Sequence, residues 1–96
     1  MEFIDNMLSF LPKTPSEMQD TLKIKFRAKR KALKITQKEL SVKSDVSLGS
    51  LKRFETSGQI SLESLLKLAF VLECLEDFEE VCKEKEEMPK SIEELL

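Results

Sequence analysis

The chain has 96 residues, of which 41% are apolar and 35% are charged, so it can build one small domain with a well-hydrated surface. It has no histidine, which excludes histidine-dependent catalytic triads and histidine-ligated zinc sites. Its two cysteines are too few for a disulfide framework or a four-cysteine metal site, and we expect no cofactor and no metal.

The first eleven residues lack the features of a secretory signal. Their charges are the acidic Glu2 and Asp5, there is no basic region, and no long apolar run follows. No stretch of the chain approaches the roughly 20 apolar residues that a membrane span requires. We therefore expect a cytoplasmic protein without a membrane partner.

Residues 1–13 are the first predicted segment, and they are amphipathic. The segment can cap the core of its own domain, exchange between two protomers, or lie in a groove of a partner protein. Five of its apolar residues have helical spacing ahead of Pro12, and they are Phe3, Ile4, Met7, Leu8 and Leu11.

The first helix of the domain is predicted to run from about Pro15 to Leu33. Thr14 provides an N-cap, a proline occupies the first helical position, and Glu17 follows three residues after the cap. The residues expected to form its core-facing stripe are Met18, Leu22, Phe26 and Leu33.

Two short helices joined by a turn should follow. Thr36-Gln37-Lys38-Glu39 repeats the capping pattern and begins the first of them, with Leu40 facing inward. Ser44 and Asp45 break the helical pattern, and Val46 is a candidate buried anchor of the turn. The spacing predicts a helix-turn-helix motif over about 36–56.

The second short helix is capped by Ser47 and runs from Leu48 to about Thr56, with Leu51 and Phe54 facing the core. Ser61 then caps a helix from Leu62 to Leu72, whose nearly all-apolar composition predicts that it is the most buried one.

A last helix is expected from about Glu76 to Glu86, with Phe78, Val81 and Cys82 on one face and Pro89 after its end. If Cys74 and Cys82 share this helix, they lie about 12 Å apart, too far for a disulfide. The sequence thus predicts an all-α, compact five-helix domain over 14–87 that is followed by an acidic tail at 88–96.

The formal net charge of −2 hides a strong segregation of charge. Residues 23–53 contain eleven Lys or Arg and two acids, a net charge of +9, whereas residues 73–96 carry −7. A basic block of this density is typical of a protein that binds a polyanion. A solvated basic helix is the alternative interpretation.

The motif predicts which side chains contact DNA. The start of its first helix should offer N–H groups and small polar side chains to a phosphate, and its second helix should reach base edges in the major groove. The candidate DNA-binding residues are Thr36, Gln37, Lys38, Lys43, Ser47, Leu48, Gly49, Ser50, Lys52 and Arg53.

The stretch from Phe26 to Leu72 resembles the XRE family of lambda-repressor-like helix-turn-helix domains. The resemblance implies that Gln37 contacts a phosphate and braces the recognition helix. It also implies that Arg30 and Glu55 form a structural salt bridge. The residues that carry it are Arg30, Thr36-Gln37, Leu40, Val46-Ser47, Leu51, Phe54-Glu55, Ser61-Leu62, Leu65 and Leu68-Ala69.

Within this family, the segments SLGSLKRFE and SLESLLKLA are most similar to the DNA-binding antitoxins of Hip-type toxin–antitoxin operons. Such proteins repress their own operon as dimers and bind a kinase-like toxin. The resemblance therefore implies a sequence-specific repressor that binds palindromic operator DNA as a homodimer, with such a toxin as its protein partner. A phage-type repressor and a restriction controller are alternatives.

The sequence departs from the family pattern at two places. Leu48 and Gly49 stand where polar base-reading residues are common, so base readout would rest on Ser50, Lys52 and Arg53. Lys34 and Asp45 stand where turn glycines are usual, and we expect about 1 kcal/mol of strain at each.

Two other classes of function compete with a repressor. An adaptor that binds another protein, and DNA only weakly or non-specifically, is suggested by Leu48-Gly49 and by the acidic C-terminal part of the chain. An enzyme has little support, because no glycine-rich phosphate loop, nucleophile–base pair or metal cluster accompanies the carboxylates.

Overall fold

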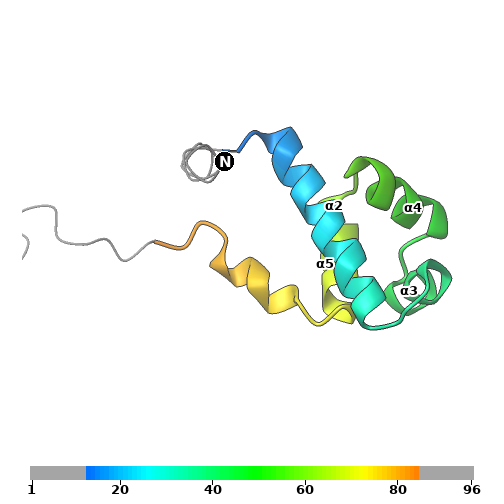
Figure 1. Ribbon diagram of the computed structural model, residues 1–96. Coiled ribbons are helices and arrows are strands. Elements are labelled where there is room, and N and C mark those ends of the chain that lie inside the picture. The colour runs from blue at the N-terminus through cyan, green and yellow to red at the C-terminus, as the bar shows by residue number, and fades with distance from the viewer. Residues whose placement is uncertain (1–12, 85–96) are drawn as a thin grey trace, which may run out of the picture.

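The computed structural model describes residues 13–84, and within them it contains helices and no strand (Figure 1). The all-α prediction is therefore confirmed. Residues 1–12 and 85–96, which include nearly all of the predicted amphipathic segment and the whole predicted tail at 88–96, lie outside the described part. The helices are α2 (Pro15–Ala32), α3 (Gln37–Ser44), α4 (Leu48–Ser57), α5 (Leu62–Val71) and the 3-10 helix η1 (Leu75–Glu80).

The α-helices begin where the sequence predicts, because each start is fixed by a side-chain cap. Thr14, Thr36, Ser47 and Ser61 each accept a hydrogen bond from the backbone N–H three residues later, at 3.1 Å in all four helices. Such a cap satisfies an N–H that has no partner inside the helix. None of the described helices has the length and apolar content needed to cross a membrane.

Several helix ends use a left-handed residue that is not glycine. Lys34 and Asp45 have φ of 58° and 61°, as expected at positions where glycine is usual. Glu73 and Cys82 also have left-handed φ values, of 63° and 60°, at positions where the sequence predicts no such turn. Gly58 ends α4 at φ 81°, where its N–H donates to the Phe54 carbonyl oxygen.

The core lies between α2, α4 and α5, with α3 closing one end (Figure 1). Phe26 from α2 meets Phe54 from α4 edge to face, with ring centroids 5.6 Å apart. Leu40, Leu51 and Leu68 are also almost completely buried. The predicted inward positions of the two short helices are therefore confirmed.

Two residues predicted to face the core are exposed instead: Met18 is 44% exposed, and Leu33 caps the end of α2 at 36% exposed. The helix predicted to be the most buried one also begins with an exposed residue, Leu62 at 68%. The stripe on α2 begins at Met18, outside the group of residues that form the core. Helix α5 contains seven apolar residues among its ten, more than one buried face can hold, so Leu62 and Phe70 face solvent.

The prediction of an α-helix over about 76–86 is wrong. Residues Leu75–Glu80 form a 3-10 helix, Val81 adopts an extended backbone, and Cys74 provides no side-chain cap. Only Phe78 of the predicted apolar face packs against the core, while Val81 and Cys82 are exposed. The acidic side chains crowded into this segment repel one another at helical spacing, which disfavours a longer helix. The two cysteines are free and do not share a helix.

A buried ion pair joins α2 to α4. The Arg30 Nε donates to Glu55 Oε2 at 2.8 Å and its Nη2 donates to Oε1 at 2.9 Å, and the two side chains are only 10% and 6% exposed. The Arg30 Nη1 also donates to the Ile35 carbonyl oxygen at 2.9 Å, which fixes the turn before α3. The salt bridge implied by the family resemblance is thus present, with bidentate geometry.

We expect Arg30→Met to lower the free energy of unfolding by about 3 kcal/mol, because the Glu55 carboxylate would lose its partner in a dry site. Urea unfolding followed by far-UV circular dichroism measures this change. The matched control is Glu63→Gln, which breaks the exposed pair with Lys67 at 3.4 Å and should cost less than about 0.5 kcal/mol. Equal costs for the two variants would contradict the structural role of the buried pair.

Replacing each of the two glycines with alanine should change the stability of the fold in opposite directions. At Gly58, a Cβ would lie 3.1 Å from Gln19 Cβ and O at a left-handed φ, so Gly58→Ala should destabilise the fold by about 1–2 kcal/mol. At Gly49, a Cβ would meet no atom of residues 13–84 within 4 Å, and Gly49→Ala should stabilise α4 by up to about 1 kcal/mol. Thermal unfolding of both variants tests this, and a lower Tm for Gly49→Ala than for the parent would contradict it.

Candidate nucleic-acid interface

The turn between α3 and α4 is held by local hydrogen bonds and by one buried anchor. The Ser41 hydroxyl donates to the Val46 carbonyl oxygen at 2.6 Å, and the Val46 N–H donates to the Ser44 hydroxyl at 3.3 Å. Val46 itself is only 3% exposed, as the sequence predicts. With Asp45 in the left-handed conformation, this turn sets the direction in which α4 leaves α3.

Helix α4 buries one side and presents the other to solvent. Leu51 and Phe54 are 1% and 0% exposed, so that side of the helix is fixed in the core. The opposite side contains the predicted base-reading positions: Gly49, Ser50, Lys52 and Arg53 are exposed, and Leu48 is half-buried. The structure therefore brings five of the predicted site residues together on one helix.

The first turn of α4 is organised by Ser47. Its hydroxyl accepts from the Ser50 N–H at 3.1 Å and donates to the Ser50 hydroxyl at 2.8 Å. The backbone of Gly49 is open on its outer side, since no other residue among 13–84 would touch a side chain there. This end of the helix thus offers small side chains and an accessible backbone to a large ligand.

The start of α3 is tied to the buried ion pair. The Gln37 side-chain amide donates from Nε2 to Glu55 Oε1 at 3.1 Å, so Gln37 braces α4 as the resemblance implies. Thr36 accepts from the Glu39 N–H and donates to Glu39 Oε1 at 3.1 Å. The hydroxyl of Thr36 is therefore used for capping, and its contribution to an interface would come from the helix start that it organises.

Arg53 has a partner that sequence reasoning missed. Its Nε and Nη2 both donate to Gln59 Oε1, at 3.2 Å and 2.6 Å. Gln59 follows the left-handed Gly58, which folds the chain back so that the amide reaches the guanidinium. The sequence contains no signal for this contact, because it depends on the path of the loop after α4.

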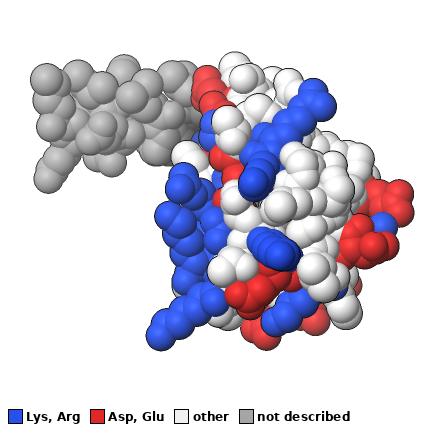
Figure 2. Space-filling view, turned by 90° about the vertical axis from the view of Figure 1, so that its right-hand side faces the viewer, with Lys and Arg blue, Asp and Glu red and all other residues white. Residues whose placement is uncertain are grey.

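The side of the molecule that carries α3 and α4 presents basic side chains beside acidic ones. Figure 2 looks onto this side and shows Lys and Arg along its left edge and at its centre, with Asp and Glu at the right, in the lower part and at the upper left. Lys38 and Lys43 of α3 and Lys52 and Arg53 of α4 are exposed. Exposed cations beside a helix-turn-helix motif match the negative potential of a duplex.

Comparison with known families agrees with this geometry. Residues 26–77, more than half of the chain, match the helix-turn-helix family in its XRE form, and the match includes α3, the turn and α4 entirely. No curated protein and no solved structure shows a significant match to the chain. The chain therefore belongs to the XRE-type helix-turn-helix family, whose members are DNA-binding transcription regulators.

Proposed function

We propose that the protein is a sequence-specific transcriptional repressor that inserts α4 into the major groove of operator DNA. The observation that carries this proposal is the orientation of α4. Its apolar side is fixed by Leu51 and Phe54 and its C-terminal half by the buried Arg30–Glu55 pair, while its polar side stays exposed. A rigid helix with one exposed polar face is what base readout requires.

Arg53 is the strongest candidate for reading a base. An arginine recognises guanine through two parallel hydrogen bonds to O6 and N7. Gln59 accepts from Nε and Nη2 of Arg53, which leaves Nη1 and the second Nη2 hydrogen to form such a pair. Gln59 is therefore a positioning residue that holds the guanidinium in advance of binding, and Ser50 and Lys52 are further candidates on the same face.

Leu48 and Gly49 support a second kind of contact. Leucine can touch the methyl group of a thymine, although it reads no hydrogen-bonding pattern. A glycine inside a helix lowers the helix stability, and no neighbour in the described part of the chain requires one at position 49. Both observations favour a close approach of the duplex to the first turn of α4.

The remaining candidate residues would position the protein on the phosphates. The N-terminus of α3, organised by Thr36 and Gln37, presents N–H groups, while Lys38 and Lys43 supply charge on the same helix. Ser47 organises the equivalent end of α4. One recognition helix reads only a few base pairs, so a homodimer on two half-sites about 34 Å apart is the proposed binding form.

The narrower proposal is that the repressor is the autoregulating antitoxin of a Hip-type operon, with a kinase-like toxin as its partner. It rests on the similarity of the α4 and α5 segments to such antitoxins. Exposed apolar side chains, among them Phe70 at 71% and Val42 at 76%, favour a protein partner of some kind. The same observation supports the competing adaptor function, which the binding measurement below distinguishes.

Fluorescence anisotropy with labelled DNA tests the repressor. At 150 mM salt, DNA from the region upstream of the protein's own gene should bind at least about 10³-fold more tightly than scrambled DNA of equal length. The affinity should fall by about 10³–10⁵ between 50 and 200 mM salt if six to ten phosphates are contacted. Equal, weak binding to both DNAs, or an affinity that does not change with salt, would favour the adaptor.

Arg53→Ala should reduce operator affinity by about 1–3 kcal/mol and relax the preference at one base pair of each half-site. Gln59→Ala should relax the preference at the same base pair by a smaller amount, because the guanidinium is kept but no longer held. Lys67→Ala, which removes one charge from α5, is the matched control. If Gln59→Ala binds all operator variants as the parent does, Gln59 has no positioning role.

A further inference from the structure

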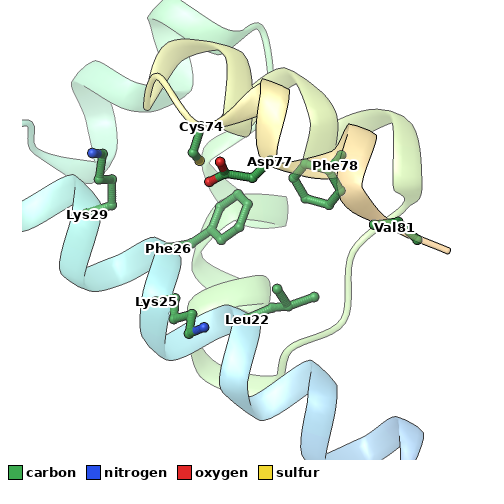
Figure 3. A pocket seen from close by; sticks show the side chains of 8 residues that line it. All are labelled: Leu22, Lys25, Phe26, Lys29, Cys74, Asp77, Phe78 and Val81. Atoms are coloured by element: carbon green, nitrogen blue, oxygen red, sulfur yellow. The ribbon is translucent and has the colours of Figure 1, made fainter. Parts of the chain in front are cut away.

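An apolar groove lies between α2 and η1, on residues that the DNA interface does not use. Its volume is about 350 Å³, and Leu22 and Phe26 from α2 face Phe78 and Val81 from the segment around η1 (Figure 3). Phe26 and Phe78 form the floor, with ring centroids 6.4 Å apart. Cys74 also lines the groove, and its charged lining residues are the basic Lys25 and Lys29 and the acidic Asp77.

The apolar surface continues out of the groove along α2. Met18, Leu22 and Phe26 are spaced four residues apart, so they form one stripe that runs from the groove toward the start of the helix. Exposure increases along this stripe, from 7% at Phe26 to 44% at Met18. Val81, on the opposite wall, is 64% exposed. The stripe and the groove together are an apolar face that nothing within residues 13–84 covers.

We propose that this face is covered by residues 1–12 of the same chain, which return along α2 as an antiparallel helix and place Phe3 in the groove. The length fits this arrangement. A helix over residues 3–11 would be about 13 Å long, and Phe26 lies about 16 Å along α2 from Pro15. Residues 12–14 would form the connection, and loops of two to five residues are usual between antiparallel helices.

The chemistry of the segment also matches the groove. Five of its apolar residues, Phe3, Ile4, Met7, Leu8 and Leu11, fall on one helical face, whereas Phe10 falls outside it. Its acidic residues, Glu2 and Asp5, would lie at the end that reaches Lys25 and Lys29. The chain beyond residue 84 is a poorer fit. Met88 comes before Pro89 and its other apolar residues, Ile92, Leu95 and Leu96, come after it, so the proline divides them. The segment also carries its own lysines as well as acids.

The thiol of Cys74 provides a local probe of this contact. Burial is the main cause that raises the pKa of Cys74, the nearby Asp77 raises it further, and Lys29 opposes both effects. In a Cys82→Ser background, Cys74 is the only thiol of the chain, and its rate of reaction with an aromatic disulfide reagent at pH 8 reports access to the groove. All measurements use the full chain.

In the double variant Phe3→Gln, Met7→Gln, Cys74 should react at least about tenfold faster than in the Cys82→Ser parent. The reason is that polar side chains at positions 3 and 7 would no longer pack residues 1–12 onto the groove. The matched control, Ile92→Gln, Leu95→Gln, should react at the parent rate. Circular dichroism melts verify that the helical domain remains folded in both. Because none of the altered residues belongs to the described core, loss of the fold is not expected.

Three results would overturn the proposal. In the first, the Phe3 and Met7 changes leave the rate unchanged, so the segment does not cover the groove. In the second, the Ile92 and Leu95 changes accelerate the reaction instead, and the C-terminal residues are the occupant. In the third, the parent rate depends on protein concentration, which means that the covering segment comes from a second copy. DNA affinity does not enter this test, so its outcome is independent of the proposed function.

Discussion

The arrangement of the domain depends on the buried pair between Arg30 and Glu55. Both groups lose most of their hydration, a cost that only close and complete hydrogen bonding can offset. Here the Arg30 guanidinium donates two hydrogen bonds to the Glu55 carboxylate and one to the Ile35 carbonyl oxygen. The Gln37 side-chain amide donates a further hydrogen bond to the same carboxylate. One cluster therefore fixes the relative positions of α2, the turn before α3, the start of α3 and the end of α4.

The Arg30–Glu55 pair also fixes which side of α4 faces the core and which side faces solvent. A helix with polar residues on one face and two buried anchors on the other could rotate or slide unless something polar defined its position. Apolar packing is non-directional, whereas the bidentate contact to Glu55 has a single geometry. The exposed face that contains Ser50, Lys52 and Arg53 is thus presented in one orientation, as the proposed base readout would require.

Features that depend on neighbouring residues along the chain were predictable from the sequence. The four caps, the left-handed turns at Lys34 and Asp45, and the buried anchors Val46, Leu51 and Phe54 all follow from spacing and from side-chain chemistry. The errors occur where tertiary contacts decide the result. Met18 lies on the predicted apolar stripe of α2 but beyond the described core. The segment that forms η1 has residues that favour an α-helix, but it lacks a side-chain N-cap. Gln59 reaches Arg53 only because Gly58 turns the chain after α4.

The charge of the basic block overstates the number of cations available to DNA. Lys23 donates to the carbonyl oxygen of Thr56 at 3.0 Å and pairs with Asp20 at 3.2 Å, so it stabilises the end of α4. Arg30 is buried in the ion pair with Glu55, and the guanidinium of Arg53 is already hydrogen-bonded to Gln59. The block of eleven basic residues therefore serves two purposes. Lys23 and Arg30 hold α4 in place, and exposed members such as Lys38 and Lys43 are the ones proposed to contact phosphates. The same positive charge that suggests a polyanion partner in the sequence is, in part, what makes a fixed α4 possible.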